Sequence, residues 1–583
     1  MKFIFKILLF TLAIISLRTN ADSVSDSSKT PRKSWDLGAM VSAANPLAVR
    51  AATEMLEKGG HAVDAAIAAH AVLGLVEPQS SGLGGGAFML VYERDEQSLI
   101  FHDGRETAPQ GASIDMFMRD GKVIPFREAW QSGTAVGVPG TVALYKAVHE
   151  QHGKLPWESL FKPAIKLASE GFIVSPRMAN SIARFGKMGR LAANPASAAY
   201  FYPSGKALQA GQLLKNPQYA KTLTNIAANG LDAFYRGGIA KAMAKAAQAD
   251  PNPGTLTEQD IMDYKTITRE VICGPFQDKK ICTTTPPSSG AAQIMIAGIY
   301  QNLTIDVTNH ADKVVAFVDA QRLAYADRDH YFGDPDAITV PLKDLVNPVY
   351  LKYRASQRFE PSANPTHGDP ATFLRSEAQA NIFGKDTTEE VPGTTHLSII
   401  DAQGNAVSMT ATVEGPFGSS RWVGGFLLNN EMTDFAREVL PGKKKPANAI
   451  AAGRRPRSSM SPTMVFDADG KLLMVTGSPG GNSIPAYVAK SIIGVFDWGL
   501  TAQEAVNHAN IIARGEKVRV EVSVEPGRAI ADDLKKRGYN VLERKGENSG
   551  LHVIVVKGNS IEGAADLRRE GVVAIPKNAK LEE

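Results

Sequence analysis

Thr394 stands where its hydroxyl could attack the peptide bond that precedes it. Pro392 restricts the backbone there, and Gly393 has no side chain to obstruct the approach to its carbonyl. Attack would form an ester, and hydrolysis of that ester would free the Thr394 amine. An N-terminal threonine can use this amine as the base that activates its own hydroxyl. These residues therefore indicate self-cleavage between Gly393 and Thr394, followed by nucleophilic catalysis at Thr394.

A second threonine is predicted to lie opposite Thr394. Segments 396–401 and 406–414 have the pattern of two short strands, and Gln403-Gly404-Asn405 between them is a turn signal. In a hairpin centred on Gln403, Thr412 pairs with Thr394, and opposed residues share a face. Such a pair alone is more typical of an ordinary polar strand face. The residues before Thr394 favour the catalytic interpretation.

The elements that must position this hairpin begin with a helix. Asn45-Pro46 supplies a cap and a first-turn proline, and Gly59-Gly60 ends the helix. Further predicted elements are an alanine-rich helix at 62–75, strands at 87–92, 99–102 and 472–475, and helices at 484–498 and 501–509. Strands and helices that alternate in this way indicate one layered α/β body.

Two other segments bear on the site. The glycine cluster 82–86 follows a helix and precedes a strand, the reverse of the order in a phosphate-binding loop, so we interpret it as a place of close packing or turning. The segment 379–391 carries several charges and few apolar residues. It is predicted to be an exposed connector at which a cut could end.

Several motifs in a consistent order resemble γ-glutamyltranspeptidases, and the similarity covers nearly the whole chain after its first residues. The motifs are Gly82 to Gly86, Gly104 to Pro109, Thr394-Thr395-His396, Leu428 to Phe435, Arg457 to Thr463 and Gly477 to Gly481. The resemblance implies an N-terminal-nucleophile hydrolase fold, a four-layer αββα sandwich. It also implies a large subunit, 22–393, and a small subunit, 394–583, interwoven in one body.

The family reaction would use Thr394 to attack the γ-carbonyl of glutathione or another γ-glutamyl compound. The acyl group would then pass to water, an amino acid or a peptide. The resemblance implies that Arg105 and Ser458 bind the donor carboxylate, that Asp434 and Glu431 bind its ammonium, and that Ser459 and Glu414 assist. Backbone amides of Gly480 and Gly481 would form the oxyanion hole, and Thr412 would hold the nucleophile's hydroxyl.

Some positions depart from the pattern of certain members or invite another role. Some members have Asn at position 414 and Gln at 431, which would alter donor preference. The segment 436–454 lacks an aromatic gate, so we hypothesise an open site that favours bulky donors or water. His396 has no carboxylate partner evident in the sequence and is predicted to be structural, and no metal or organic cofactor is expected.

The bulk composition indicates an ordinary globular protein. The net charge of +4 arises from 64 basic and 60 acidic residues among 583, which argues against nucleic acid or an anionic membrane as a partner.

Residues 1–21 read as a secretory signal cut after Ala21. They are too short for a membrane anchor, because the apolar run 7–17 rises only ~16 Å as a helix against a ~30 Å bilayer core. We expect a secreted or periplasmic protein with no membrane anchor. Cys273 and Cys282 are either two unremarkable small residues or a hairpin disulfide, and both alternatives stay open.

Two rival functions remain. An amidase of the same fold that acts on cephalosporin or glutaryl substrates would not need a carboxylate such as Asp434 for an ammonium group. A secreted binding protein would need neither the Gly393–Thr394 bond nor the oxyanion glycines, and would stay in one piece.

Overall fold

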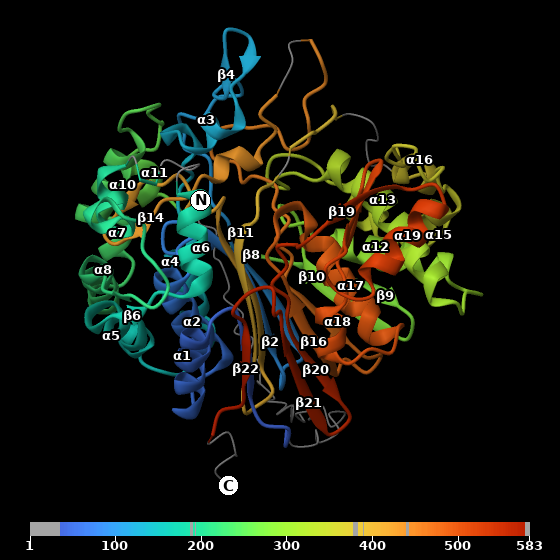
Figure 1. Cartoon of the computed structure of the whole chain (residues 1–583), viewed down its shortest axis with the longest axis horizontal. Coiled ribbons are helices and arrows are strands. Elements are labelled where there is room, and N and C mark those ends of the chain that lie inside the picture. Colours follow the sequence, from blue (N-terminus) through green and yellow to red (C-terminus); the bar gives the residue numbers. More distant parts are fainter. Residues whose placement is uncertain are drawn as a thin grey trace, which may run out of the picture. The chain divides into compact units, whose positions relative to one another are not determined.

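Two antiparallel sheets pack face to face, and helices cover both outer faces in the computed structural model (Figure 1). The strand order of the first sheet is β22 (Val572–Ala574), β1 (Met40–Ala43), β11 (Gly393–Ile400), β12 (Ala406–Glu414), β2 (Gly86–Glu93), β3 (Ser98–Gly104) and β8 (Ile267–Arg269). That of the second is β21 (Ser560–Ala565), β20 (His552–Lys557), β16 (Leu472–Gly477), β15 (Thr463–Phe466), β10 (Lys279–Thr284) and β9 (Val271–Phe276).

Helices α1 (Pro46–Glu57), α2 (Ala62–Val76) and α4 (Thr141–His152) cover the first sheet, and α5 (Lys162–Glu170), α6 (Pro176–Phe185), α8 (Pro217–Asn229) and α10 (Gly237–Ala247) continue that layer. Helices α12 (Gly290–Leu303), α13 (His310–Tyr331), α17 (Ile484–Phe496) and α18 (Ala502–Asn507) form the layer beyond the second sheet. The predicted αββα arrangement is confirmed.

The structure describes residues 35–186, 191–192, 194–376, 383–388, 390–438 and 442–577. The elements all belong to the unit that starts at Asp36. The predicted signal, 1–21, lies outside the described residues. None of the described helices is long and apolar enough to cross a membrane.

Strands from both sides of Thr394 alternate within the sheets. In the first sheet, β1 lies between β22 and β11, and β12 pairs with β2. In the second, β10 from before Thr394 pairs with β15 from after it. A cut before Thr394 would therefore leave two pieces joined by the hydrogen bonds of both sheets.

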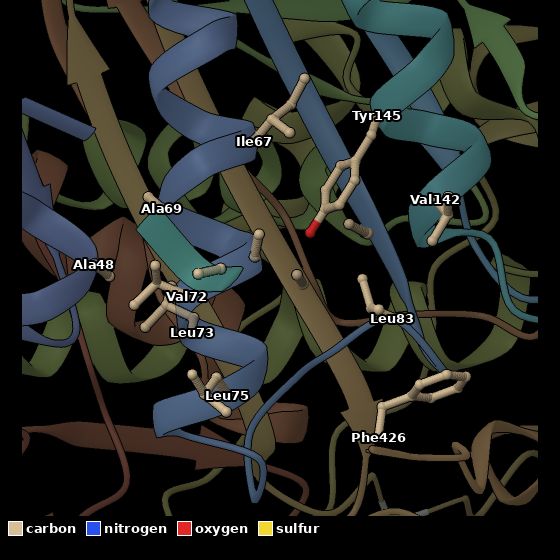
Figure 2. Packing of buried hydrophobic residues seen from close by; sticks show 14 of the residues in the cluster. Ala48, Ile67, Ala69, Val72, Leu73, Leu75, Leu83, Val142, Tyr145 and Phe426 are labelled. Atoms are coloured by element: carbon tan, nitrogen blue, oxygen red, sulfur yellow. The ribbon is translucent and has the colours of Figure 1, made fainter. Parts of the chain in front are cut away.

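The helix α2 packs the first sheet against its helical layer. All its residues are buried, in keeping with a sequence that is apolar or small on nearly every side. Figure 2 shows Ile67, Val72 and Leu73 of this helix in one core with Val142 and Tyr145 of α4. The predicted first helix is also confirmed, since Asn45 caps α1 by accepting a hydrogen bond from the Leu47 amide at 2.9 Å.

The hairpin of β11 and β12 has the predicted register, in which Thr394 pairs with Thr412. Its apolar side chains, such as Val407 and Met409, join the core under α2. Its hydroxyl face is buried against the second sheet, where the Ser408 hydroxyl donates to the Thr476 carbonyl at 2.9 Å. The polar side chains of this face are therefore satisfied inside the protein, as buried polar groups require.

Cys273 and Cys282 form a disulfide between the paired strands β9 and β10. The two cysteines face each other in the register of this hairpin. Of the two alternatives left open by the sequence, the structure has the bonded one.

Candidate active site

Thr394 is the second residue of β11 and is buried, with 4% of its surface exposed. The strand register shifts between Gly393 and Thr394, so that Gly393 pairs with Glu414 while Thr394 pairs with Thr412. A side chain at Gly393 would come within 2.3 Å of the Glu414 carbonyl oxygen. The absent side chain therefore lets the bond before Thr394 lie directly against β12.

The Thr412 hydroxyl lies beside the carbonyl that Thr394 would attack. It donates a hydrogen bond to the Gly393 carbonyl oxygen at 2.9 Å and accepts one from the Glu414 amide at 2.8 Å. The Thr394 hydroxyl is 3.3 Å from it and must be the donor of that pair, because Thr412 has a single hydroxyl hydrogen. Thr412 thus polarises the Gly393 carbonyl, a contact that strand pairing alone does not reveal.

Replacing Thr412 with alanine should slow cleavage before Thr394 roughly 100-fold, because one hydrogen-bond donor to the developing oxyanion is lost. Intact mass measured over time after expression would record the appearance of the two pieces. Thr412→Ser keeps the hydroxyl and should cleave nearly as the wild type does. If Thr412→Ala were cleaved at the wild-type rate, Thr412 would have no role in stabilising the oxyanion during cleavage.

Arg105 is the centre of a buried ion-pair cluster. It follows β3, and its guanidinium contacts Glu431 and lies 2.7 Å from Asp434, both in the 3₁₀ helix η4 (Glu431–Asp434). It also donates to the Pro456 carbonyl at 3.1 Å and to the Arg457 carbonyl at 2.9 Å. Burial opposes its charge, but the surrounding carboxylates raise the pKa of Arg105 above its usual range.

Carboxyl groups outnumber cations around this cluster. One guanidinium, that of Arg105, and four carboxyl groups line the same small cavity: Glu390, Glu414, Glu431 and Asp434. Burial raises the pKa of the last three well above the usual range, and neighbouring carboxylates add to the rise. A cation that enters this cavity would lower the repulsion among them.

The segment before Thr394 was predicted to be an exposed connector, and this is only partly correct. Lys385 and Thr387 are exposed, but the end of the segment, Glu390 and Val391, lines the site. Asp386, Thr388 and Glu390 are buried. Glu390 lies 2.5 Å from Arg328 and accepts from the Ser459 amide at 2.8 Å. Burial works to raise the pKa of Glu390, but the charges of Arg328 and Arg457 outweigh it and lower the pKa. The charges of this segment suggested exposure, but Arg328 and Arg457, which are distant in the sequence, make the burial of Glu390 possible.

The cavity beside Thr394 has a volume of only about 10 Å³, close to the ~10–15 Å³ that one water needs. It is lined by Arg105, Glu390, Val391, Thr394, Thr412, Glu414, Glu431, Asp434, Ser458, Met460, Gly481 and Ile484. In the continuous chain there is no room for a substrate at this place. Residues 390–391 must move before one can bind.

Most of the predicted site residues come together here, with two exceptions. Ser459 does not line the cavity, and its hydroxyl accepts from Arg328 at 2.7 Å. Both glycines have a positive φ, 140° at Gly480 and 56° at Gly481. Gly480 is packed against the Tyr487 ring, and a side chain at Gly481 would come within 2.5 Å of the Glu390 carbonyl oxygen. Sequence reasoning missed Glu390, Arg328, Met460 and Ile484 as site residues. Two of them carried a positional signal: Glu390 lies four residues before Thr394, and Met460 lies within the motif Arg457 to Thr463.

Two secondary predictions are confirmed. His396 is buried, its ring nitrogens contact the hydroxyls of Thr410 at 2.8 Å and Ser398 at 3.1 Å, and burial lowers its pKa well below the usual value. It is a structural residue. The glycine cluster serves close packing, since a side chain at Gly85 would lie 1.9 Å from the Thr412 carbonyl oxygen.

The arrangement suits acyl transfer. The Thr412 hydroxyl polarises the Gly393 carbonyl and contacts the Thr394 hydroxyl, and a glycine turn and an ion cluster border the same space. The cluster can hold a small ligand that carries both an anionic and a cationic group.

Comparisons with known proteins agree with this chemistry. The chain matches the family model for γ-glutamyltranspeptidase over residues 48–575. It is 36% identical over 518 residues to the glutathione hydrolase proenzyme of Bacillus subtilis (strain 168), with 86% of each chain covered.

Two solved structures are similar. The cephalosporin acylase from Bacillus halodurans has a TM-score of 0.80 at 24% identity and covers 95% of this chain and 99% of its own, which supports the fold alone. One chain of the Helicobacter pylori γ-glutamyltranspeptidase has a TM-score of 0.52 at 31% identity and covers 57% of this chain and 94% of its own.

Proposed function

The chain belongs to the γ-glutamyltranspeptidase family, and we propose on this basis that it cuts itself between Gly393 and Thr394 and then hydrolyses or transfers γ-glutamyl groups. The observation that carries the proposal is the Thr412 hydroxyl, which donates to the Gly393 carbonyl and lies 3.3 Å from the Thr394 hydroxyl. The same threonine serves first in cleavage and then in catalysis. Glutathione and related γ-glutamyl compounds are the proposed donors.

Cleavage would proceed by attack of the Thr394 hydroxyl on the Gly393 carbonyl carbon. The new C–O bond replaces the peptide C–N bond, and the Thr394 nitrogen takes up a proton and becomes an amine. Water then hydrolyses the ester, which leaves the Gly393 carboxylate and regenerates the hydroxyl. The contact of Thr412 with the carbonyl oxygen supports this path, because the oxygen gains negative charge in the first step.

Donor binding would use Arg105, Glu431 and Asp434, which form ion pairs with one another in the continuous chain. A γ-glutamyl donor carries an α-carboxylate and an α-ammonium. Its carboxylate would replace the carboxyl partners of Arg105, with Ser458 beside it, and its ammonium would meet Asp434 and Glu431. Glu414 lines the same cavity and would add negative charge, whereas Ser459 would assist only through its neighbours.

The excess of carboxyl groups also disfavours an amidase for glutaryl or cephalosporin substrates. A glutaryl group has a carboxylate but no ammonium, so it would leave the repulsion among Glu414, Glu431 and Asp434 uncompensated. The similar acylase fold does not outweigh this charge argument, because folds host different substrates.

Acylation of Thr394 would release the amine half of the donor. The N-terminal amine of Thr394 would take the hydroxyl proton and return it to the leaving nitrogen. Gly481, at the edge of the cavity, and Gly480 before it are the proposed oxyanion donors once residues 390–393 have moved. The acyl group would then pass to water, an amino acid or a peptide.

Two subunits, 22–393 and 394–583, are the proposed mature form. The coverage of only 57% of this chain by a nearly complete relative chain supports a division of this kind. We also propose secretion to the periplasm or beyond, on the strength of the predicted signal in 1–21. The openness of the segment 436–454 stays a hypothesis, because residues 439–441 lie outside the described part.

The experiment that tests the function combines mass, sequence and turnover of the purified secreted protein. We expect a small chain that begins Thr394-Thr395-His396 and a preparation that releases glutamate from glutathione. An uncut chain that binds γ-glutamyl compounds without turnover would favour the binding-protein alternative. Cleavage elsewhere would remove Thr394 from the mechanism.

A further inference from the structure

A second cavity lies on the other side of the segment that closes the active site. Its volume is about 370 Å³, and its lining includes Pro392, Pro416, Gln79 and Arg569. The active-site cavity touches Glu390, Val391 and Glu414, whereas this one touches Pro392 and Pro416. The two cavities therefore adjoin the same pair of segments, 390–393 and 414–416, at successive residues.

The wall between them is the segment that cleavage would free. A side chain at Gly393 would lie within 2.8 Å of the Pro416 backbone nitrogen, so the two segments are in close contact. Once the bond before Thr394 is cut, displacement of 391–393 would join the cavities into one groove, with the Thr394 hydroxyl between them.

The second cavity is rich in guanidinium groups. Arg177 and Arg184 come from α6, where positions 177, 180, 181 and 184 share one face and line the cavity. Arg568 and Arg569, near the end of the described chain, also line it, and Glu570 is the one carboxyl group among its described lining residues. Arg184 is exposed, so one guanidinium group of the lining is in contact with solvent.

These arginines differ in how far they are neutralised. Arg568 is paired with Glu521 at 2.8 Å and with Asp566 at 3.1 Å, and Arg177 lies 3.4 Å from Glu77. Arg569 donates to the backbone carbonyls of Thr394, Asn548 and Ser549, at 2.7, 3.0 and 3.2 Å.

Burial and the charge of Arg177 lower the pKa of Arg569 to about 9. An anion near Arg177 and Arg569 would relieve the repulsion between them.

Gln79 adds a buried amide group to the lining of this cavity. Its side chain is 3% exposed, and neither its amide nitrogen nor its amide oxygen has a hydrogen-bond partner. Leaving both atoms unpaired in a buried position is unfavourable, by ~1–3 kcal/mol for a typical buried group. A bound molecule with an amine or amide and a carboxylate would satisfy them.

We infer that this arginine-rich cavity is the subsite for the acceptor, an amino acid or short peptide with a free carboxylate. The inference rests on the proposed function. The acceptor carboxylate would face Arg177 and Arg184, and its amine would point past Gln79 toward the acyl group on Thr394. Recognition of a carboxylate by guanidinium groups would favour α-amino acids and peptides over simple amines.

The transfer step exchanges an ester bond for an amide bond. The acceptor amine nitrogen forms a new amide bond with the γ-glutamyl carbonyl carbon, and the ester C–O bond to Thr394 breaks. The proton that the nitrogen loses passes through the Thr394 amine to the Thr394 hydroxyl oxygen. No other reactant is needed.

The test compares two acceptors on the cleaved enzyme, glycylglycine and glycylglycinamide, which differ only in the terminal carboxylate. In Arg184→Gln and Arg177→Gln, the KM for glycylglycine should rise roughly tenfold, while that for glycylglycinamide stays within about twofold. Arg50→Gln, an exposed arginine on α1, is the matched control and should change neither. Because two arginines are replaced separately, the test still gives a result if one of the two variants fails to fold.

Several results would overturn the inference. One is an unchanged KM for glycylglycine, and another is an equal rise for both acceptors. A third is slower cleavage before Thr394 with normal acceptor use, which would assign the arginines to the new Gly393 carboxylate. Wild-type hydrolysis of the donor without acceptor is measured in parallel, so that failure of the proposed function is distinguished from failure of the subsite.

Discussion

Replacing Thr394 with alanine is expected to leave the chain in one piece and to abolish γ-glutamyl turnover. Alanine removes the hydroxyl that lies beside Thr412 and is proposed to attack the Gly393 carbonyl, so no ester can form and no N-terminal amine is freed. The loss should exceed 10³-fold in both reactions, because nucleophile and base are the same residue. Intact mass and glutamate release from glutathione measure the two effects.

Thr394→Ser is the matched control, since it keeps the hydroxyl and loses one methyl group. We expect it to be cleaved, although more slowly, and to retain measurable turnover. Its methyl loss changes the packing of a buried residue only slightly. If the alanine variant were still cut before residue 394, or still turned over glutathione after cleavage by another route, Thr394 would not be the nucleophile.

Asp434→Asn should lower kcat/KM for a γ-glutamyl anilide roughly 10³-fold. The change keeps the shape of the side chain but removes the charge proposed to bind the donor ammonium, and loss of one partner in a buried charge pair costs about 4 kcal/mol. In the continuous chain Asp434 lies 2.7 Å from Arg105, and Glu431 keeps contact with the same guanidinium. Cleavage before Thr394 should therefore persist.

The matched substrate is a glutaryl anilide, which has the carboxylate and lacks the α-amine. Its slow hydrolysis should be unchanged or faster in Asp434→Asn, because a repulsive charge is gone. The exposed Glu438, further along the same segment, supplies the control Glu438→Gln, which should behave as the wild type. An equal loss on both anilides would mean that Asp434 does not recognise the ammonium.

These expectations share one structural cause, the closed state of the site before cleavage. Glu390 and Val391 fill the space beside Thr394, and Arg105 is satisfied by the carboxyl groups that the donor would later engage. The continuous chain thus pairs the charge of Arg105 without a substrate. Cleavage would exchange these internal partners for those of a γ-glutamyl donor.

The sequence alone was enough to predict the local features of the structure. The cap at Asn45, the turn at Gln403 to Asn405 and the alternation in β12 act over a few residues, so the helix, the hairpin and the pairing of Thr394 with Thr412 could all be predicted. The four-layer arrangement and the residues of the site came from the family resemblance, because periodicity reports which elements form and not how sheets stack.

Long-range contacts decided the rest. The burial of Glu390 depends on Arg328 and Arg457, which lie 62 and 67 positions away, and its own charge suggested exposure. The polar face of β12 became an interface between sheets, and the wall between the two cavities formed from residues 390–393 and 414–416. Electrostatic and packing energies act through space, so only the folded chain brings together the partners that set them.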